Sequence, residues 1–413
     1  MRVVGPETYR VNNYQPPRPK RRWRKPLIFL LTLVGLAGAV WAFRNDSPPP
    51  NLSTLIKQNQ SSDDSFNYLD GRYLFSGTIV LARAVEKEAG GDYNQPFSGL
   101  STFKPDIYDA WMADLECPVT TNQVSYQAQI ANLVFNCRPE WLPTMAKYFK
   151  IVNLAGNHTY DMGAEGFPET VSHLKKAGIT PIGNYSPRVK EDICKVIALP
   201  VKIKSTKDAN KAEKARLPVA FCAWHYFSFS PEAGEIEAMK QYANVMPVFA
   251  FMHAGTEYLA QAQPNQVDLA HKIINAGPPE FLIGNSPHWV QNTEVYNDKL
   301  IVYSTGNFIF DQVDAETMRG ASIDAKMSLG YDDNLKKWLA LADKCQASSE
   351  SCLAEAKQQG LRKVKASFTF DAIGNTSGNK RITRKADSTL QAAIDQRLNW
   401  AESMRKLGQE GAD

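Results

Sequence analysis

The chain has 413 residues, of which 43% are hydrophobic, 10% aromatic and 22% charged. These values are typical of globular proteins and exclude a wholly disordered chain, a collagen-like chain and a polytopic membrane protein. The length allows two or three domains of ordinary size and a substantial hydrophobic core.

The net charge of +4 is unevenly distributed along the chain. Residues 1–26 contain eight basic residues and one acidic residue, so this tail carries +7 and residues 27–413 carry −3. A nucleic-acid-binding domain is normally basic, so the charge of the body predicts no nucleic-acid partner.

An uncharged apolar run of seventeen residues, LIFLLTLVGLAGAVWAF, follows the basic tail at residues 27–43. Because basic residues cluster at its N-terminal end alone, we expect a single transmembrane helix in the cell membrane, with tail 1–26 cytoplasmic and the main domain extracytoplasmic. A cleaved signal peptide is the alternative, since Val40-Trp41-Ala42 resembles a cleavage site, but the long segment before the run favours an uncleaved signal anchor. Residues 44–72, largely rich in Pro, Ser, Asn and Asp, are expected to form a tether.

From Tyr73 onward, short β-branched or aromatic runs alternate with segments of helical periodicity, which is typical of an α/β layered fold. The expected strands are residues 73–81, 110–115, 151–154, 196–203, 219–223, 248–252, 281–283 and 300–304. The expected helices are residues 140–148, 165–177 and 265–276. Residues 313–413 are expected to form a C-terminal extension with a partly helical insertion at 314–362, a return strand at 364–370 and an amphipathic helix at 388–407.

The six cysteines are consistent with an exported compartment in which disulfides form. Fifteen pairings are possible, and the sequence alone does not choose among them. Cys345 and Cys352 are near enough in sequence to close one loop, whereas Cys222 lies in an apolar run and is expected to be a buried free thiol.

Polar clusters follow several of the expected strands, at the strand ends where α/β folds place their sites. They are Ser76-Gly77-Thr78, Asp114-Leu115-Glu116, Gly156-Asn157-His158, His253, Ser286-Pro287-His288 and residues 303–308. Imidazole, carboxylate and amide oxygen are the groups that hold Zn, Mn or Fe in hydrolases. His173, His225 and His271 fall outside these clusters or on helices, and we expect them to have no functional role.

Seven motifs occur in the order GTIVLAR (77–83), DLECPVT (114–120), LAGNHTYDMGAEG (154–166), HAGTEY (253–258), Gln266, IGNSPHWVQ (283–291) and YSTGNFIFD (303–311). In this order they resemble the CapA family of membrane-anchored poly-gamma-glutamate capsule-biosynthesis proteins, over about residues 73–312. The resemblance implies a metallophosphatase-like α/β/β/α sandwich outside the cell membrane.

The resemblance also implies a site. The carboxylate of the family's NLE motif corresponds to Glu116, the amide and imidazole of NNH to Asn157 and His158, the histidine of HWGxE to His253, and the last histidine of HPH to His288. These residues would ligate a divalent metal such as Mn, Zn or Fe, with Arg83, Glu116, His158 and His253 as the catalytic groups. Arg83 would hold an anionic group, and Asp161, Glu257 and Asn307 would orient the ligands.

Three motif positions depart from the family pattern. The first-strand aspartate is Thr78, the first histidine of HPH is Ser286, and the NNH motif begins with Gly156. Neutral hydroxyls rarely hold a transition metal unaided, so we expect at least one metal position to be weakened. The Glu116 carboxylate ends a buried strand and therefore needs a nearby cation, either Arg83 or a metal.

Two hypotheses therefore remain open. The first is a membrane-anchored, metal-dependent hydrolase or transferase of capsule or exopolymer biosynthesis, acting on a polymer or a phosphorylated precursor. The second is a non-catalytic envelope assembly factor of the same fold, which binds an anionic polymer such as polyglutamate or a membrane synthase complex. Thr78 and Ser286 favour the second hypothesis, and the sequence leaves open whether the protein is an enzyme.

Overall fold

The computed structural model describes residues 66–187, 189–208, 211–227, 230–378 and 380–409. The predicted tail, the predicted transmembrane helix at 27–43 and most of the predicted tether lie outside these residues. Within the described ranges, no helix combines the length and the apolar character that crossing a membrane requires.

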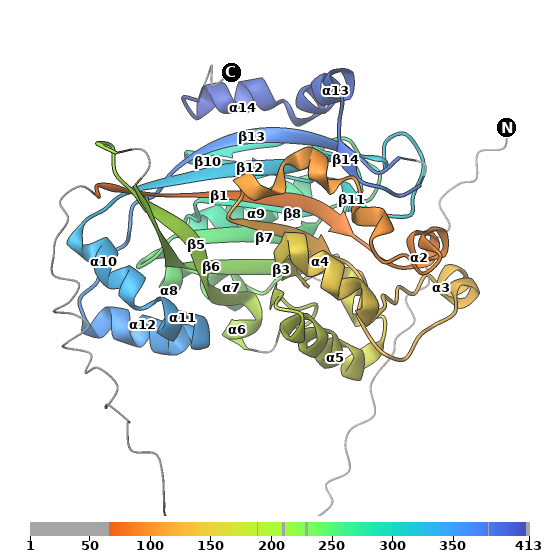
Figure 1. Ribbon diagram of the computed structural model, residues 1–413, viewed down its shortest axis with the longest axis horizontal. Coiled ribbons are helices and arrows are strands. Elements are labelled where there is room, and N and C mark those ends of the chain that lie inside the picture. Colours follow the sequence, from red (N-terminus) through yellow and green to blue (C-terminus); the bar gives the residue numbers. More distant parts are fainter. Residues whose placement is uncertain (1–65, 188, 209–210, 228–229, 379, 410–413) are drawn as a thin grey trace, which may run out of the picture. The chain divides into compact units, whose positions relative to one another are not determined.

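The described residues form a mixed sheet of fourteen strands, in which β1 (Tyr68–Ile79) is the branching strand (Figure 1). The first half of β1 pairs antiparallel with β12 (Arg319–Gly330) and β5 (Cys194–Lys204), and its second half pairs parallel with β2 (Ala110–Leu115). One arm of the sheet, here the first arm, continues from β2 through β3 (Phe149–Asn153) to β4 (Thr180–Ile182). The second arm runs from β5 through β6 (Ala212–Tyr226), β7 (Val248–Ala254), β8 (Phe281–Asn285) and β10 (Lys299–Val302) to β9 (Thr293–Tyr296).

The C-terminal residues complete this sheet. Beyond β12 the order continues through β13 (Ser367–Thr376) to β14 (Arg384–Lys385), and the short strand β11 (Asn307–Ile309) pairs with the end of β1. The expected C-terminal extension, residues 313–413, therefore supplies strands to the same sheet as the residues before it, because β12 lies directly beside β1.

The two arms pack face to face through aromatic rings. Phe75 of β1 lies 5.8 Å from the ring centroids of Phe249 and Phe251 on β7 and 5.2 Å from that of Phe281 on β8, although β1 pairs with neither strand. These contacts therefore cross between layers rather than along the sheet. Aromatic side chains bury a large apolar area each, so this interface forms much of the principal core.

Helices cover the outer faces of both arms (Figure 1). Their bounds are α2 (Arg83–Ala89), α3 (Tyr126–Asn132), α4 (Leu142–Tyr148), α5 (Gly163–Lys176), α6 (Lys190–Ile193), α7 (Ala233–Glu237), α8 (Lys240–Ala243), α9 (Pro264–Ala276), α10 (Asp333–Ala340), α11 (Ala342–Ala347), α12 (Ser349–Gln358), α13 (Ser388–Leu398) and α14 (Trp400–Lys406). Leu142 of α4 and Leu174 of α5 share a core with Trp111 of β2, while α9, α10 and α12 pack into the core of the second arm. Since both faces of β6 are covered, Leu217 to Trp224 are continuously buried.

The expected α/β class is confirmed, and the strand at 110–115 has the predicted bounds. Two expectations for the C-terminal extension were wrong. Residues 319–330 form β12 rather than part of a helical insertion, because small and apolar side chains at alternating positions, such as Ile323 and Met327, face the core. The terminal helix is divided at Asn399, whose φ of 56° ends α13 in the left-handed conformation.

All six cysteines, which lie within the described residues, form disulfides: Cys117–Cys137, Cys194–Cys222 and Cys345–Cys352. The expected Cys345–Cys352 loop is confirmed, and it joins α11 to α12. The expected free thiol at Cys222 was wrong, because the antiparallel register of β5 and β6 places Cys194 directly opposite it.

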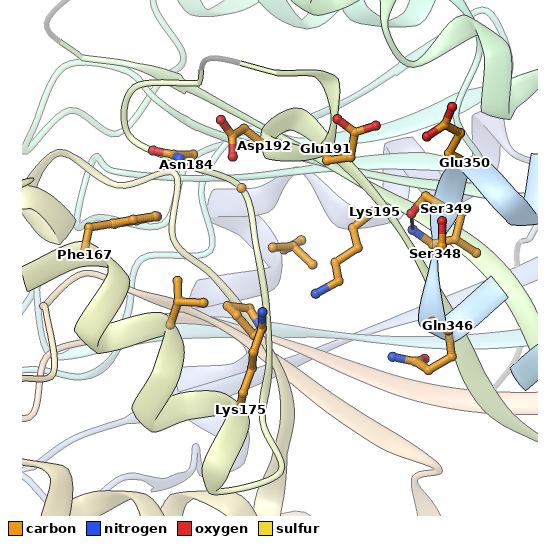
Figure 2. A pocket seen from close by; sticks show the side chains of 16 residues that line it. Phe167, Lys175, Asn184, Glu191, Asp192, Lys195, Gln346, Ser348, Ser349 and Glu350 are labelled. Atoms are coloured by element: carbon orange, nitrogen blue, oxygen red, sulfur yellow. Dashed lines mark hydrogen bonds between the residues drawn. The ribbon is translucent and has the colours of Figure 1, made fainter. Parts of the chain in front are cut away.

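A cavity of about 410 Å³ opens where α5, β4, β5 and α12 meet (Figure 2).

Candidate functional site

Two rows of polar side chains cross the sheet at the carboxyl ends of its parallel strands, where α/β folds usually bind ligands. In the first arm the register places Thr78, Asp114 and Asn153 side by side on β1, β2 and β3. In the second arm it places His225, His253 and Asn285 side by side on β6, β7 and β8. Asp114 Oδ2 lies 3.0 Å from His253 Nδ1, so the two rows meet at this contact.

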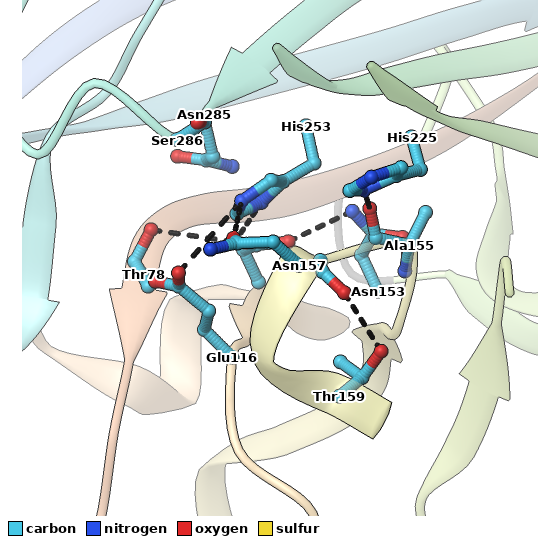
Figure 3. Close-up of polar contacts among 12 residues, drawn as sticks. Thr78, Glu116, Asn153, Ala155, Asn157, Thr159, His225, His253, Asn285 and Ser286 are labelled. Atoms are coloured by element: carbon cyan, nitrogen blue, oxygen red, sulfur yellow. Dashed lines mark hydrogen bonds and ion pairs between the residues drawn. The ribbon is translucent and has the colours of Figure 1, made fainter. Parts of the chain in front are cut away.

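Asp114, Glu116 and His253 form the centre of the site (Figure 3, in which Glu116 and His253 are labelled). Each offers a ligand atom within 4.8 Å of the others, and their side chains are at most 1% exposed. Glu116 Oε1 lies 3.8 Å from His253 Nε2, and Glu116 Oε2 has no hydrogen-bond partner among the described residues. Burial, followed by the charge of Asp114, raises the pKa of Glu116 well above its ordinary value. A cation between these groups would offset the cost of burying them.

Three histidines of the site are fixed by the same kind of contact. In each, Nδ1 lies against an oxygen: Asp114 Oδ2 for His253 at 3.0 Å, Asp161 Oδ2 for His158 at 2.7 Å, and Asn307 Oδ1 for His288 at 3.0 Å. An oxygen that accepts from Nδ1–H leaves the lone pair of Nε2 free, which is the arrangement of histidines that ligate metals. Burial lowers the pKa of His288 to about 4, so this imidazole is neutral at pH 7.

The surroundings of His253 Nε2 are also compatible with a metal ligand. Its Nε2 lies 2.8 Å from Asn157 Oδ1, at the start of a 3₁₀ turn (Asn157–Tyr160) that follows β3. If Nδ1–H donates to Asp114, Nε2 and Asn157 Oδ1 are both acceptors and cannot bond to one another. Rotation of the Asn157 amide, a second proton on the imidazole or a cation held by the two atoms each resolves this conflict.

His158 and Arg83 lie on opposite sides of one aromatic ring. The ring of Phe135 stacks on His158 at 3.8 Å between centroids, and the Arg83 guanidinium lies 4.2 Å from the centre of the same ring. Asp161 also accepts a hydrogen bond from the Phe135 backbone N–H at 2.6 Å, so it holds both partners in the stack. Arg83 forms its ion pair with Asp311, not with Glu116. The cation expected beside Glu116 is therefore not supplied by a direct contact with Arg83.

His288 is held from two sides. Asn307 donates through Nδ2 to Gln312 Oε1 at 3.0 Å and to Thr317 O at 3.2 Å, so its Oδ1 is fixed toward His288. Glu257 Oε1 lies 3.8 Å from His288 Nε2, and burial raises the pKa of this carboxyl. His288 also has a positive φ of 60°, and strained backbone of this kind is concentrated at functional sites.

The positions that depart from the family pattern are bonded internally. Thr78 donates through Oγ1 to Asp114 Oδ2 at 3.3 Å, and Ser286 donates through Oγ to Gly255 O at 3.5 Å. Ser286 has a φ of 107°, which is strained for a residue with a side chain. Thr78 therefore contacts the cluster of Asp114, Glu116 and His253 through Asp114.

Sequence reasoning placed Asp114 in a polar cluster but gave it no role in the site, although it sits between Thr78, Asn153 and His253. The signal was present, because the motif here begins with Asp where NLE has Asn. Asn153 donates through Nδ2 to Asp114 Oδ1 at 2.8 Å and was also missed. The expectation that His225 lies outside the polar clusters was wrong, since β6 places its ring 6.3 Å from that of His253 (Figure 3). Burial lowers the pKa of His225 to about 4.

The other two histidines lie on helices, as expected. His173 of α5 contacts Glu169, and His271 of α9 contacts Glu294 and stacks on Tyr296. Neither belongs to the two rows of polar side chains.

Comparison with known proteins places the chain in a family. The family model for the bacterial capsule synthesis protein PGA_cap matches residues 72–312, more than half of the chain. The chain belongs to the PGA_cap family. The CapA resemblance seen in the sequence is thus confirmed, and the matched residues include both rows of the site.

Two curated relatives cover most of the chain. The PGA biosynthesis protein CapA of Bacillus subtilis is 27% identical over 304 residues, which is 70% of this chain and 71% of the relative. The capsule biosynthesis protein CapA of Bacillus anthracis is 25% identical over 308 residues, or 69% of this chain and 68% of the relative. A probable polyglutamine synthesis accessory protein of Mycobacterium tuberculosis is 23% identical over 233 residues, or 53% of this chain and 60% of the relative.

Among solved structures, a novel phosphatase from Mycoplasma pneumoniae aligns with a TM-score of 0.34 at 9% identity, over 78% of this chain and 96% of the phosphatase. GAP50, the anchor in the inner membrane complex of Plasmodium, aligns with a TM-score of 0.34 at 8% identity, over 79% of this chain and 95% of that protein.

Proposed function

We propose that this protein takes part in the synthesis of a capsule or exopolymer of the poly-gamma-glutamate type. In this proposal, residues 27–43 anchor it in the cell membrane and the domain of two sheet arms works outside the cytoplasm, with a metallophosphatase-like α/β/β/α arrangement. The relatives named for PGA, capsule and polyglutamine synthesis support the process. The basic tail followed by an apolar run supports the anchor.

We further propose that the site holds a divalent cation such as Mn, Zn or Fe. The observation that carries this proposal is the set of three histidines whose Nδ1 atoms each face a fixed oxygen, one of which, His253, lies 3.8 Å from Glu116, a carboxylate whose Oε2 has no partner among the described residues. Glu116, His253 and Asn157 would be the ligands closest to the cation, with His158 and His288 contributing beside them. A bound cation of this kind supplies a polarised phosphorus or carbonyl oxygen and an activated water.

The remaining residues have separate tasks in this proposal. Asp114 keeps the proton of His253 on Nδ1, and Asp161 does the same for His158, so each Nε2 stays available. Asn307 fixes His288 in the same way. Arg83, held by Asp311 and the ring of Phe135, would face an anionic part of the substrate. The reaction class is hydrolysis or transfer at a polymer or a phosphorylated precursor.

A non-catalytic assembly factor is the second candidate function, and a specific observation favours it. Thr78 and Ser286 donate to Asp114 and to the backbone of Gly255, and neutral hydroxyls are weak metal ligands, so two ligand positions of the family pattern are weakened here. In this case the domain would bind an anionic polymer or a membrane synthase without chemistry.

The test uses cells that depend on this protein for their anionic surface polymer. Glu116→Ala and His158→Ala should each abolish polymer production while the protein remains folded and in the membrane fraction. Glu140→Gln, at an exposed glutamate away from the site, is the control and should produce polymer normally. Normal polymer in both site variants would overturn the catalytic proposal.

A further inference from the structure

The cavity between α5, β4, β5 and α12 lies apart from the residues assigned above (Figure 2). Its volume of about 410 Å³ lies within the range of small-molecule sites and exceeds what a single inorganic ion needs. Its lining comes from segments far apart in sequence, from Phe167 on α5 to Glu350 on α12. The cavity is therefore a product of the tertiary fold.

Two lysines form one end of the cavity. The side chains of Lys175 and Lys195 point toward one another in Figure 2. In the part of the chain that the structure describes, neither ammonium group has an ion pair or a hydrogen bond. Burial, and then the charge of Lys175, lowers the pKa of Lys195. A half-buried lysine beside a second lysine is unfavourable unless an anion joins them.

A third donor faces the same end. Gln346 Oε1 accepts a hydrogen bond from the backbone N–H of Ala198 at 2.8 Å, which leaves the NH₂ group of Gln346 as a donor on the cavity side. Ser349 Oγ accepts from the backbone N–H of Val196 at 2.9 Å. These two bonds tie the segment from α11 to α12 onto β5 and hold the wall of the cavity in place.

The opposite end of the cavity is acidic. Glu191 and Glu350 lie there, and Figure 2 shows their carboxylates turned away from the two lysines. The charges are therefore separated: ammonium groups at one end and carboxylates at the other. A simple anion would use only one end, whereas a ligand with a carboxylate and N–H groups would use both.

We propose that this cavity is a second binding site, for an acidic peptide-like ligand whose carboxylate lies between Lys175 and Lys195. The N–H groups of the ligand face Glu191 and Glu350, and the NH₂ of Gln346 donates to the carboxylate. The class of ligand follows from the separated charges and the volume. The choice of glutamate as the acidic unit rests on the proposed function.

The cavity backs onto the candidate metal site without sharing its residues. Gly183 lines the cavity, and a Cβ at this position would come within 2.7 Å of Asn153 Oδ1, which belongs to the row of Asp114. A ligand bound in the cavity would thus lie beside β4, close to the row that contains Asn153.

Isothermal titration calorimetry on the full chain tests the proposal with two probes, a short γ-linked glutamate oligomer and inorganic phosphate. The variants are Lys195→Gln and Lys175→Gln, and the control is Lys176→Gln, an exposed lysine next to Lys175 that does not line the cavity. Loss of one charged partner should weaken oligomer binding by about tenfold or more in each cavity variant, with no change in the control. Lys175 is exposed, so its variant keeps the test valid even if Lys195→Gln does not fold.

Equal affinity of the wild type and both cavity variants for the oligomer would overturn the site, as would the absence of binding at millimolar oligomer. Phosphate binding as tight as oligomer binding would overturn the peptide-like ligand. Metal affinity should be unchanged in all three variants, so failure of this proposal and failure of the proposed metal centre give different results.

Discussion

Asp114→Asn should weaken metal binding, because it changes which nitrogen of His253 carries the proton. The protein should stay folded, because aspartate and asparagine are nearly isosteric. Asp114 Oδ1 accepts from Asn153 Nδ2, while Oδ2 faces both His253 Nδ1 and the hydroxyl of Thr78. If an asparagine keeps the bond to Asn153, its NH₂ faces His253, so Nδ1 must become an acceptor. The proton of the neutral imidazole then moves to Nε2, the atom that faces Glu116 and Asn157.

Loss of such an orienting carboxylate typically lowers metal affinity about 10- to 100-fold, or by about 1.4 to 2.7 kcal/mol. The assay is competition of Mn or Zn with a chelating dye on the full chain. Asp324→Asn is the matched control, since Asp324 is equally buried but bonds to Arg72 outside the site. The control should lower stability and leave metal affinity unchanged. Unchanged metal affinity in Asp114→Asn would refute the assigned role of Asp114.

Three further predictions concern stability. Glu116→Gln should abolish metal binding yet raise the stability of the metal-free protein by about 1 kcal/mol or more, because it removes a buried charge with an unpartnered oxygen; a lower melting temperature without metal would contradict this. Replacing Cys117 and Cys137 by serine opens a loop of sequence separation 20 and should lower the free energy of unfolding by about 3 kcal/mol in urea titrations, and an unchanged midpoint would count against it. Lys195→Met should raise the free energy of unfolding at pH 7, because it removes the cost of burying the ammonium group. This gain should shrink as the pH rises from the lowered pKa of Lys195 toward the unfolded value of 10.5, because the lysine of the native state loses its proton before that of the unfolded state. A gain that does not change between pH 7 and 10.5 would disprove the assigned cost.

Much of the site could be anticipated from the sequence because strand ends are local features. The run at 248–252 is apolar, and the run at 110–115 is apolar except for Asp114; the two runs are followed at once by His253 and Glu116, so the placement of these residues at strand ends needed no tertiary information. Parallel pairing then brings such ends to one edge of a sheet.

The contact between the two rows of polar side chains could not be predicted from the sequence. Asp114 and His253 are 139 residues apart, and their contact depends on one arm of the sheet facing the other. The sequence shows that the first-strand aspartate of the family is Thr78, but it does not show that the carboxylate of Asp114 lies beside Thr78 on β2. The register that makes Thr78 and Asp114 neighbours is a tertiary property.

The same limit applies to β12 and to the disulfides. The alternation of Ile323, Ala325 and Met327 is weak because alanine has little strand preference, and only the pairing with β1 makes these residues a strand. Cys194 and Cys222 lie in adjacent antiparallel strands, so their bond follows from a register that composition does not reveal.

The most direct test of the central claim is the metal content of the full chain, measured by elemental mass spectrometry after purification and after reloading with Mn, Zn or Fe. The account predicts about one bound divalent ion per chain or more, lost in Glu116→Gln and in His253→Asn. Folded protein that stays free of metal after reloading, or that binds as much metal in both variants as in the wild type, would contradict it.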